Sequence, residues 1–186
     1  MSMVREQYAA VAETLQKDWS KRNRYEIPRL QKIVVNVGMG TAHEDKAYRE
    51  LVLGSLAQIT GQKPVVNKAK QSIAGFKLRE GMEIGASVTL RGTRMLDFYA
   101  RLVHIVLPRV RDFRGLSPRA FDGHGNYSLG LREHTVFPEI SFDDVTQSHP
   151  LQITIVTTGN SDDEAREVLR RLDFPFSDKH KEADGA

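Results

Sequence analysis

The residues best suited to chemistry lie between Gln62 and Lys77, where lysine, amide, hydroxyl and aromatic side chains follow one another closely. Cations at roughly two-residue spacing can all project from one side of an extended chain. Serine and asparagine donate hydrogen bonds to phosphate or 2′-hydroxyl oxygens, and a ring such as Phe76 can stack on a base. The segment is therefore predicted to bind RNA. A basic surface loop without a partner is the alternative.

Catalysis is a weaker interpretation of the ionisable residues. The six histidines are scattered without the i, i+4 pair of a helix-borne metal site, and the chain has no cysteine, so neither a metal site nor a cofactor is expected. Asp122, His124, Glu133 and His134 form the densest group suited to acid–base chemistry, but no nucleophile motif or phosphate-binding loop accompanies them. An enzyme acting on RNA or nucleotides stays open as the rival hypothesis, with a pure protein-interaction module as a third.

A Gly38-x-Gly40 turn follows an apolar segment and precedes a helical pattern, as in dinucleotide-binding folds. His43 occupies the place of the third glycine. A tight structural turn, or a turn whose backbone contacts RNA phosphate, is therefore favoured over a dinucleotide site.

Charge is distributed unevenly along the chain although the formal net charge is only +3. Residues 61–119 carry twelve Lys and Arg against four Asp and Glu, whereas residues 120–186 carry six against thirteen. This asymmetry predicts one surface for phosphates and another for protein or solvent.

Hydrophobic periodicity predicts the elements that position these residues. In chain order they are helix 3–19, strand 32–37, helix 44–60, a short strand at 64–66, a long loop over 67–83, strand 84–91, helix 94–110, strand 127–131, strand 151–156 and a helix opened by a capping box at Ser161-Asp-Asp-Glu164. Pro108 should end or kink its helix in the last turn. The order indicates an α+β fold, a mostly antiparallel sheet with helices on one face and an open face for RNA.

Four longer segments resemble one known family. They are QKPVVNKAKQSIAGFKLREG (Gln62–Gly81), GASVTLRG (Gly85–Gly92), FYARLVHIVLPRVRDFRGL (Phe98–Leu116) and SFDDV (Ser141–Val145). Together they are similar to the bacterial fifth large-subunit ribosomal protein, which binds 5S rRNA, and the resemblance runs from about Met3 to Phe176. It implies a curved sheet whose concave face holds 5S rRNA in the central protuberance, and no enzymatic activity.

The resemblance also implies partners and contact residues. The loop Lys68–Gly81 is similar to a family loop that reaches P-site tRNA, and the region Leu131–Val145 to the part that meets the thirteenth small-subunit protein in an intersubunit bridge. The 23S rRNA and neighbouring large-subunit proteins are further expected partners. With the basic segment included, the expected RNA-binding residues are Asn36, Gly38, Met39, Lys63, Val66, Lys68, Lys70, Ser72, Phe76, Lys77, Arg79, Thr89 and Arg91.

Residues 1–176 are expected to form one domain, and the polar residues 177–186 a disordered tail. The first eight residues contain Arg5 and Glu6 where a signal peptide needs an apolar stretch, and no apolar run is long enough to cross a membrane. A cytoplasmic protein without a membrane partner is the expectation.

Overall fold

The computed structural model describes residues 2–19, 23–40, 45–141 and 147–177. The chain divides into two compact units. The first unit contains residues 1–33, 91–129 and 154–186, and the second contains residues 34–90 and 130–153. The predicted single domain over residues 1–176 stays a prediction, and the predicted tail beyond Ser177 lies outside the described residues.

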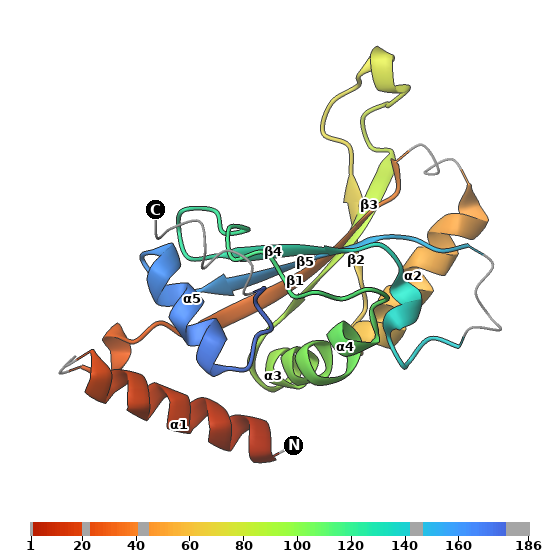
Figure 1. Cartoon of the computed structure of the whole chain (residues 1–186). Helices are drawn as coiled ribbons and strands as arrows, with labels where there is room; N and C mark the ends of the chain where they lie inside the picture. The colour runs from red at the N-terminus through yellow and green to blue at the C-terminus, as the bar shows by residue number, and fades with distance from the viewer. Residues whose placement is uncertain (1, 20–22, 41–44, 142–146, 178–186) are drawn as a thin grey trace. The chain divides into compact units, whose positions relative to one another are not determined.

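The elements follow the predicted order (Figure 1). The helices are α1 (Ser2–Asp18), α2 (Lys46–Thr60), α3 (Gly92–Arg101), α4 (Leu107–Arg109) and α5 (Asp162–Arg171), with a π-helical segment η4 (Leu102–Val106) and short 3₁₀ turns η1 (Arg24–Glu26), η3 (Ala74–Phe76) and η5 (His134–Val136). The strands are β1 (Leu30–Gly38), β2 (Val65–Lys68), β3 (Glu83–Leu90), β4 (Tyr127–Leu131) and β5 (Leu151–Thr157).

The five strands form one antiparallel sheet that is not closed, in the order β2-β3-β1-β5-β4. The predicted α+β class is thereby confirmed. Strands β2 and β3 lie wholly in the second unit, whereas β1, β4 and β5 contribute residues to both units.

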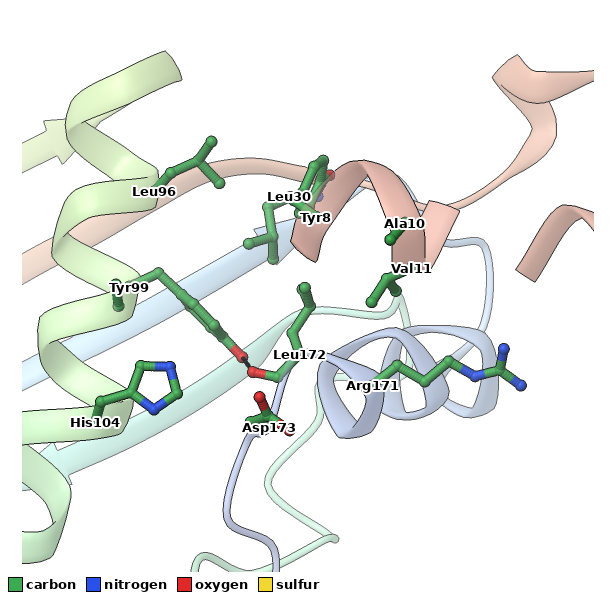
Figure 2. A pocket seen from close by; sticks show the side chains of 11 residues that line it. Tyr8, Ala10, Val11, Leu30, Leu96, Tyr99, His104, Arg171, Leu172 and Asp173 are labelled. Atoms are coloured by element: carbon green, nitrogen blue, oxygen red, sulfur yellow. Dashed lines mark hydrogen bonds between the residues drawn. The ribbon is translucent and has the colours of Figure 1, made fainter. Parts of the chain in front are cut away.

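In the first unit, α1 contacts α3 and α5. Tyr99 is 3% exposed, and its hydroxyl donates a hydrogen bond to the Leu172 carbonyl at 3.2 Å. Figure 2 shows this contact beside a pocket that side chains of α1, α3 and α5 line. The rings of Tyr127, Phe174 and Phe176 meet edge to face with centroids 5.0–5.7 Å apart. The Phe174–Phe176 segment thus packs against Tyr127 of β4.

The helix predicted over residues 94–110 runs from Gly92 to Arg109 through the π-helical segment η4. Pro108 lies in its last turn, and Val110 is already extended with ψ 130. Proline has no N–H to continue the hydrogen-bond ladder, so the helix ends where the sequence predicts.

In the second unit, α2 contacts β3 and buries Val52, Leu56 and Ile59. The Asp45 carboxylate caps α2 by accepting a hydrogen bond from the Ala47 N–H at 2.9 Å. Gly61 ends the helix in the left-handed region at φ +63. This helix covers one face of the strands that carry the candidate site. No helix among the described residues is long and apolar enough to cross a membrane.

Candidate RNA interface

Burial alternates along β1 and defines the two faces of the sheet. Ile33, Val35 and Val37 are at most 1% exposed, whereas the alternate residues Val34 and Asn36 are partly exposed. Because successive side chains of a strand point to opposite faces, Asn36 belongs to the face that faces away from the core. We call this face the open face.

The register between β2 and β3 extends the open face. Val65 lies opposite Ser87, and Val66 lies opposite Ala86. Ala86 is fully buried, so Val66 belongs to the covered face, while Val65 is 64% exposed on the open face. Val66, which the family resemblance implies as an RNA-binding residue, therefore does not share the face of Val65.

The open face of the second unit carries several uncharged polar side chains. Ser87 donates a hydrogen bond from Oγ to Asn67 Oδ1 at 3.3 Å, and Asn36 Nδ2 contacts Gln152 Oε1 at 3.5 Å. Thr89 is exposed at the next outward position of β3. Hydroxyl and amide groups donate and accept hydrogen bonds, so this surface suits a polar ligand such as the sugars and phosphates of RNA. Ser87 and Gln152 were missed by the sequence analysis, since only strand register places them here, whereas Asn67 lies in the segment that was predicted to bind RNA.

An ordered hairpin loop over residues 69–82 joins β2 to β3 and extends beyond their ends (Figure 1). Ile73 and Leu78 exchange backbone hydrogen bonds of 2.9 and 3.1 Å. The Ser72 hydroxyl accepts a hydrogen bond from the Glu80 N–H at 2.9 Å. The predicted loop is therefore held by its own backbone, and one predicted site residue, Ser72, has this structural role.

The charged and aromatic side chains of this hairpin face solvent. Phe76 is 71% exposed at the tip, where Lys77 adopts a left-handed conformation at φ +53. Lys68, Lys70 and Arg79 are exposed, and within the described residues these cations and Lys77 form no ion pair. A fixed backbone therefore presents free cations and one aromatic ring, which is the combination that binds phosphates and stacks on bases.

The remaining predicted residues differ in exposure and in the compact unit to which they belong. Lys63 and Gly38 are exposed. Met39 is 3% exposed and its N–H donates to the Ile84 carbonyl, so its side chain is part of the core. Arg91 is exposed but is assigned to the first compact unit. The structure thus groups the other predicted residues in the second unit.

The glycine turn after β1 does not resemble a phosphate-binding junction. Gly40 has φ +52, as a tight turn requires, whereas His43 lies outside the described residues. The Asp45 carboxylate already accepts the first N–H groups of α2. A negative charge at this position opposes a phosphate, which disfavours the dinucleotide alternative.

Asp122, one of the four residues considered for acid–base catalysis, has a structural role instead. Asp122 accepts hydrogen bonds from the His124 N–H at 2.9 Å and from Asn126 Nδ2 at 2.7 Å. The Asn126 hydrogen bond is the main reason why the pKa of Asp122 lies below its ordinary value. Asp122 and His124 belong to the first unit and Glu133 and His134 to the second. Among the described residues, no group of three or more His, Asp or Glu side chains is arranged to hold a metal.

His134 is buried against His149, with parallel rings whose centroids are 4.0 Å apart. The His149 N–H donates to His134 Nδ1 at 3.3 Å, and Ser55 Oγ lies 2.8 Å from His149 Nε2. Burial lowers the pKa of His149 to about 4, with the neighbouring His134 as a second cause. Burial also lowers the pKa of His134. Both rings are neutral near pH 7, and the pair links η5 to the residues just before β5.

Comparisons with known proteins agree with these features. A family model described as ribosomal protein L5 matches residues 23–79, and a second model, which describes the C-terminus of the same ribosomal family, matches residues 83–176. The chain is 51% identical over 178 residues to large ribosomal subunit protein uL5 of Halothermothrix orenii, covering 95% of this chain and 99% of the relative. It is 55% identical over 155 residues to the uL5 of Heliobacterium modesticaldum, covering 83% and 86%. The chain therefore belongs to the ribosomal protein L5 family, whose members are structural constituents of the large ribosomal subunit and not enzymes.

Proposed function

We propose that the open face of the second unit binds 5S rRNA and helps to attach it in the central protuberance of the large subunit. The observation that carries this proposal is the group of uncharged polar side chains on the strands of the open face, Asn36, Asn67, Ser87, Thr89 and Gln152, with the exposed Lys63 just before β2. As a member of its family the chain works in the ribosome, which lies in the cytoplasm of a bacterial cell.

Short polar side chains on an open sheet face suit contact with a folded RNA better than contact with a regular duplex groove. They reach sugars, phosphates and the edges of unstacked bases, and a rigid sheet fixes their spacing. Binding by this surface depends on the shape of the RNA more than on its base sequence. Lys63, Lys68 and Arg91 then add phosphate contacts at the ends of the strands.

The hairpin over Lys68–Gly81 is proposed to contact P-site tRNA. Its exposed Phe76, Lys77 and Arg79 lie on a segment that extends beyond the strands, so they can reach an RNA other than the one on the open face (Figure 1). An exposed ring with neighbouring cations binds single-stranded or irregular RNA through stacking and charge.

The region Leu131–Val145 is proposed to meet the thirteenth small-subunit protein in an intersubunit bridge, and the rest of the surface to contact 23S rRNA and neighbouring large-subunit proteins. Asp143 and Asp144, two of the four acidic residues of that region, lie outside the described residues. Charge reversal at both is expected to weaken subunit association and to leave 5S rRNA binding unchanged. Sucrose-gradient sedimentation of reconstituted ribosomes measures the first effect.

The central test is filter binding of the purified chain to 5S rRNA, tRNA and an unrelated structured RNA over a range of salt concentrations. Tight, salt-dependent preference for 5S rRNA supports the proposal, and equal binding to all three RNAs contradicts it. Lys63→Ala is expected to reduce the slope of log affinity against log salt by roughly 0.7 to 0.9. Lys46→Ala, an exposed lysine on α2 in the same unit, is the matched control and should leave the slope unchanged.

A further inference from the structure

The hairpin loop over residues 69–82 leaves the sheet through an irregular base. Asn67 pairs with Gly85, but the next residue of β2, Lys68, pairs with Glu83. Strand β3 therefore carries one extra residue at this point, which is the arrangement of a β-bulge. A bulge bends its strand and increases the local twist. Because the regular ladder stops here, the direction in which the hairpin leaves the sheet depends on further contacts.

Beyond the bulge, hydrogen bonds within the hairpin hold it together as one body. The Ala69 N–H donates to the Met82 carbonyl at 2.8 Å, and the Gly81 N–H donates to the Ala69 carbonyl at 2.9 Å. The bonds between Ile73 and Leu78 continue this pairing toward the tip. These bonds join residues of the hairpin to one another, so they keep its shape but do not tie it to the rest of the unit.

A side-chain contact crosses from the base of the hairpin to α2. Arg49 Nη1 donates to Glu83 Oε2 at 2.7 Å, and the two side chains are only 28% and 35% exposed. A charge-assisted hydrogen bond is stronger than a neutral one, and partial burial reduces its screening by salt. Arg49 lies in the first turn of α2, which the Asp45 carboxylate caps. Glu83 is the first residue of β3 after the hairpin, so the ion pair ties the hairpin base to a fixed helix end.

The neighbouring charges leave Arg49 and Glu83 to each other. Lys46 and Glu50 of the same helix pair with one another at 3.8 Å and are largely exposed. Lys68, opposite Glu83 in the strand register, forms no ion pair within the described residues. Arg49 Nε is buried and has no hydrogen-bond partner in the described part of the chain, so the guanidinium depends on Glu83. Removal of either partner therefore leaves an uncompensated charge at a half-buried position.

We propose that Arg49 and Glu83 are positioning residues, whose ion pair sets the direction of the hairpin relative to α2. Both act through the hairpin and not through contact with RNA. Phe76 lies seven residues before Glu83, so its ring is the end of a lever. At about 3.3 Å per residue the lever is up to about 20 Å long, and a rotation of about 10° at its base moves the tip by about 3 to 4 Å. A displacement of that size separates a ring from the base on which it stacks.

The direction of the hairpin is measured on the full chain without any RNA. The chain has no cysteine, so Gln58→Cys on α2 and Ala74→Cys in the hairpin give two unique, exposed sites for spin labels. Pulsed electron paramagnetic resonance then gives the distribution of distances between the labels. Arg49→Met and Glu83→Gln are each expected to shift or broaden this distribution by at least about 3 Å. The charge-reversed double variant R49E/E83R restores the ion pair and should return the distribution to that of the labelled parent.

The effect on RNA binding is measured with the unlabelled chain, and this part rests on the proposed tRNA contact of the hairpin. Arg49→Met is expected to weaken tRNA binding to the P site of reconstituted ribosomes at least about fivefold, the loss of one stacked base, and to leave 5S rRNA binding unchanged. R49E/E83R should restore tRNA binding. Glu50→Gln, which removes an exposed ion pair from the same helix, is the matched control and should change neither affinity. Thermal melting followed by circular dichroism checks that every variant folds.

An unchanged label distance in both single variants overturns the proposal, because an ion pair with a merely structural role lowers the melting temperature without redirecting the hairpin. A change that R49E/E83R fails to reverse also overturns it, since the two residues would then act independently. If the label distance shifts but tRNA binding does not, Phe76→Ala decides between two outcomes. Weaker tRNA binding in Phe76→Ala would overturn the positioning role, whereas unchanged binding would mean that only the proposed tRNA contact fails.

Discussion

Val65 lies directly opposite Ser87 in the β2–β3 pair, so the two side chains emerge together from the open face of the sheet. Val65 is 64% exposed there, whereas its neighbour Val66 points to the face that α2 helps to cover. An exposed valine between polar residues has no packing role in the isolated chain. Its position makes it a sensitive probe of what binds to this face.

Val65→Glu is expected to weaken 5S rRNA binding by about tenfold or more, because a carboxylate on the open face repels phosphates. The free energy of unfolding should change by less than about 1 kcal/mol, since the side chain is exposed on an edge strand. Filter binding and urea unfolding measure the two effects. Val65→Thr keeps shape and neutrality and is the control. Wild-type affinity in the glutamate variant would place the RNA elsewhere.

Phe76→Ala tests the hairpin separately from the open face. The ring is 71% exposed, so its removal should leave thermal stability unchanged within about 0.5 kcal/mol. Loss of one stacking partner is expected to weaken tRNA binding to the P site of reconstituted ribosomes by about 1 to 3 kcal/mol. 5S rRNA binding should stay the same. A parallel loss for both RNAs would contradict separate roles for hairpin and sheet.

The buried histidine pair predicts a loss of stability in mild acid. The pKa of His149 is lowered from its ordinary value of 6.5 to about 4 in the folded chain, so the unfolded chain binds more protons between these values. The free energy of unfolding should therefore be highest above about pH 6.5 and fall as the pH decreases toward about 4. The shifted pKa of His149 accounts for at most about 3 kcal/mol of this decrease in the free energy of unfolding. Urea unfolding at a series of pH values measures it.

His149→Gln is expected to flatten this pH dependence, because glutamine keeps a hydrogen-bonding group near Ser55 without titrating. His104→Gln is the control, since His104 is exposed, and it should keep the wild-type slope. The slope, not the absolute stability, is the readout, so a destabilised variant still gives an answer. A wild-type slope in His149→Gln would mean that other groups cause the acid sensitivity.

Gly85→Ala is predicted to destabilise the chain by about 1 to 3 kcal/mol. An added Cβ would lie 2.8 Å from the Val37 carbonyl oxygen, because β3 and β1 approach closely at this point. Gly38→Ala, where an added Cβ meets nothing within 4 Å, is the control and should cost much less. Thermal or urea unfolding compares the two. Equal losses of unfolding free energy in the two variants would show that strand propensity, and not the close approach of β3 to β1, determines the destabilisation.

The helices and their ends could be predicted because local chemistry decides them. Asp45 and Gly61 bound α2, Ser161 Oγ caps α5 by accepting from the Glu164 N–H, and Pro108 lies in the last turn of its helix. Each signal acts within one turn of chain, so no tertiary information is needed. The π-helical segment η4 was not predicted, since its residues have the same apolar spacing as an ordinary helix.

The sequence by itself determined the element order, the α+β class, the basic middle segment and the family resemblance, because composition, periodicity and motif order are properties of the chain alone. Only the tertiary structure decided which side chains share a surface. Strand register placed Val65, Asn67 and Ser87 on the open face and turned Val66 and the Met39 side chain toward the core. A shift of one residue reverses every side chain of a strand, and hydrogen bonds between strands distant in sequence set that register.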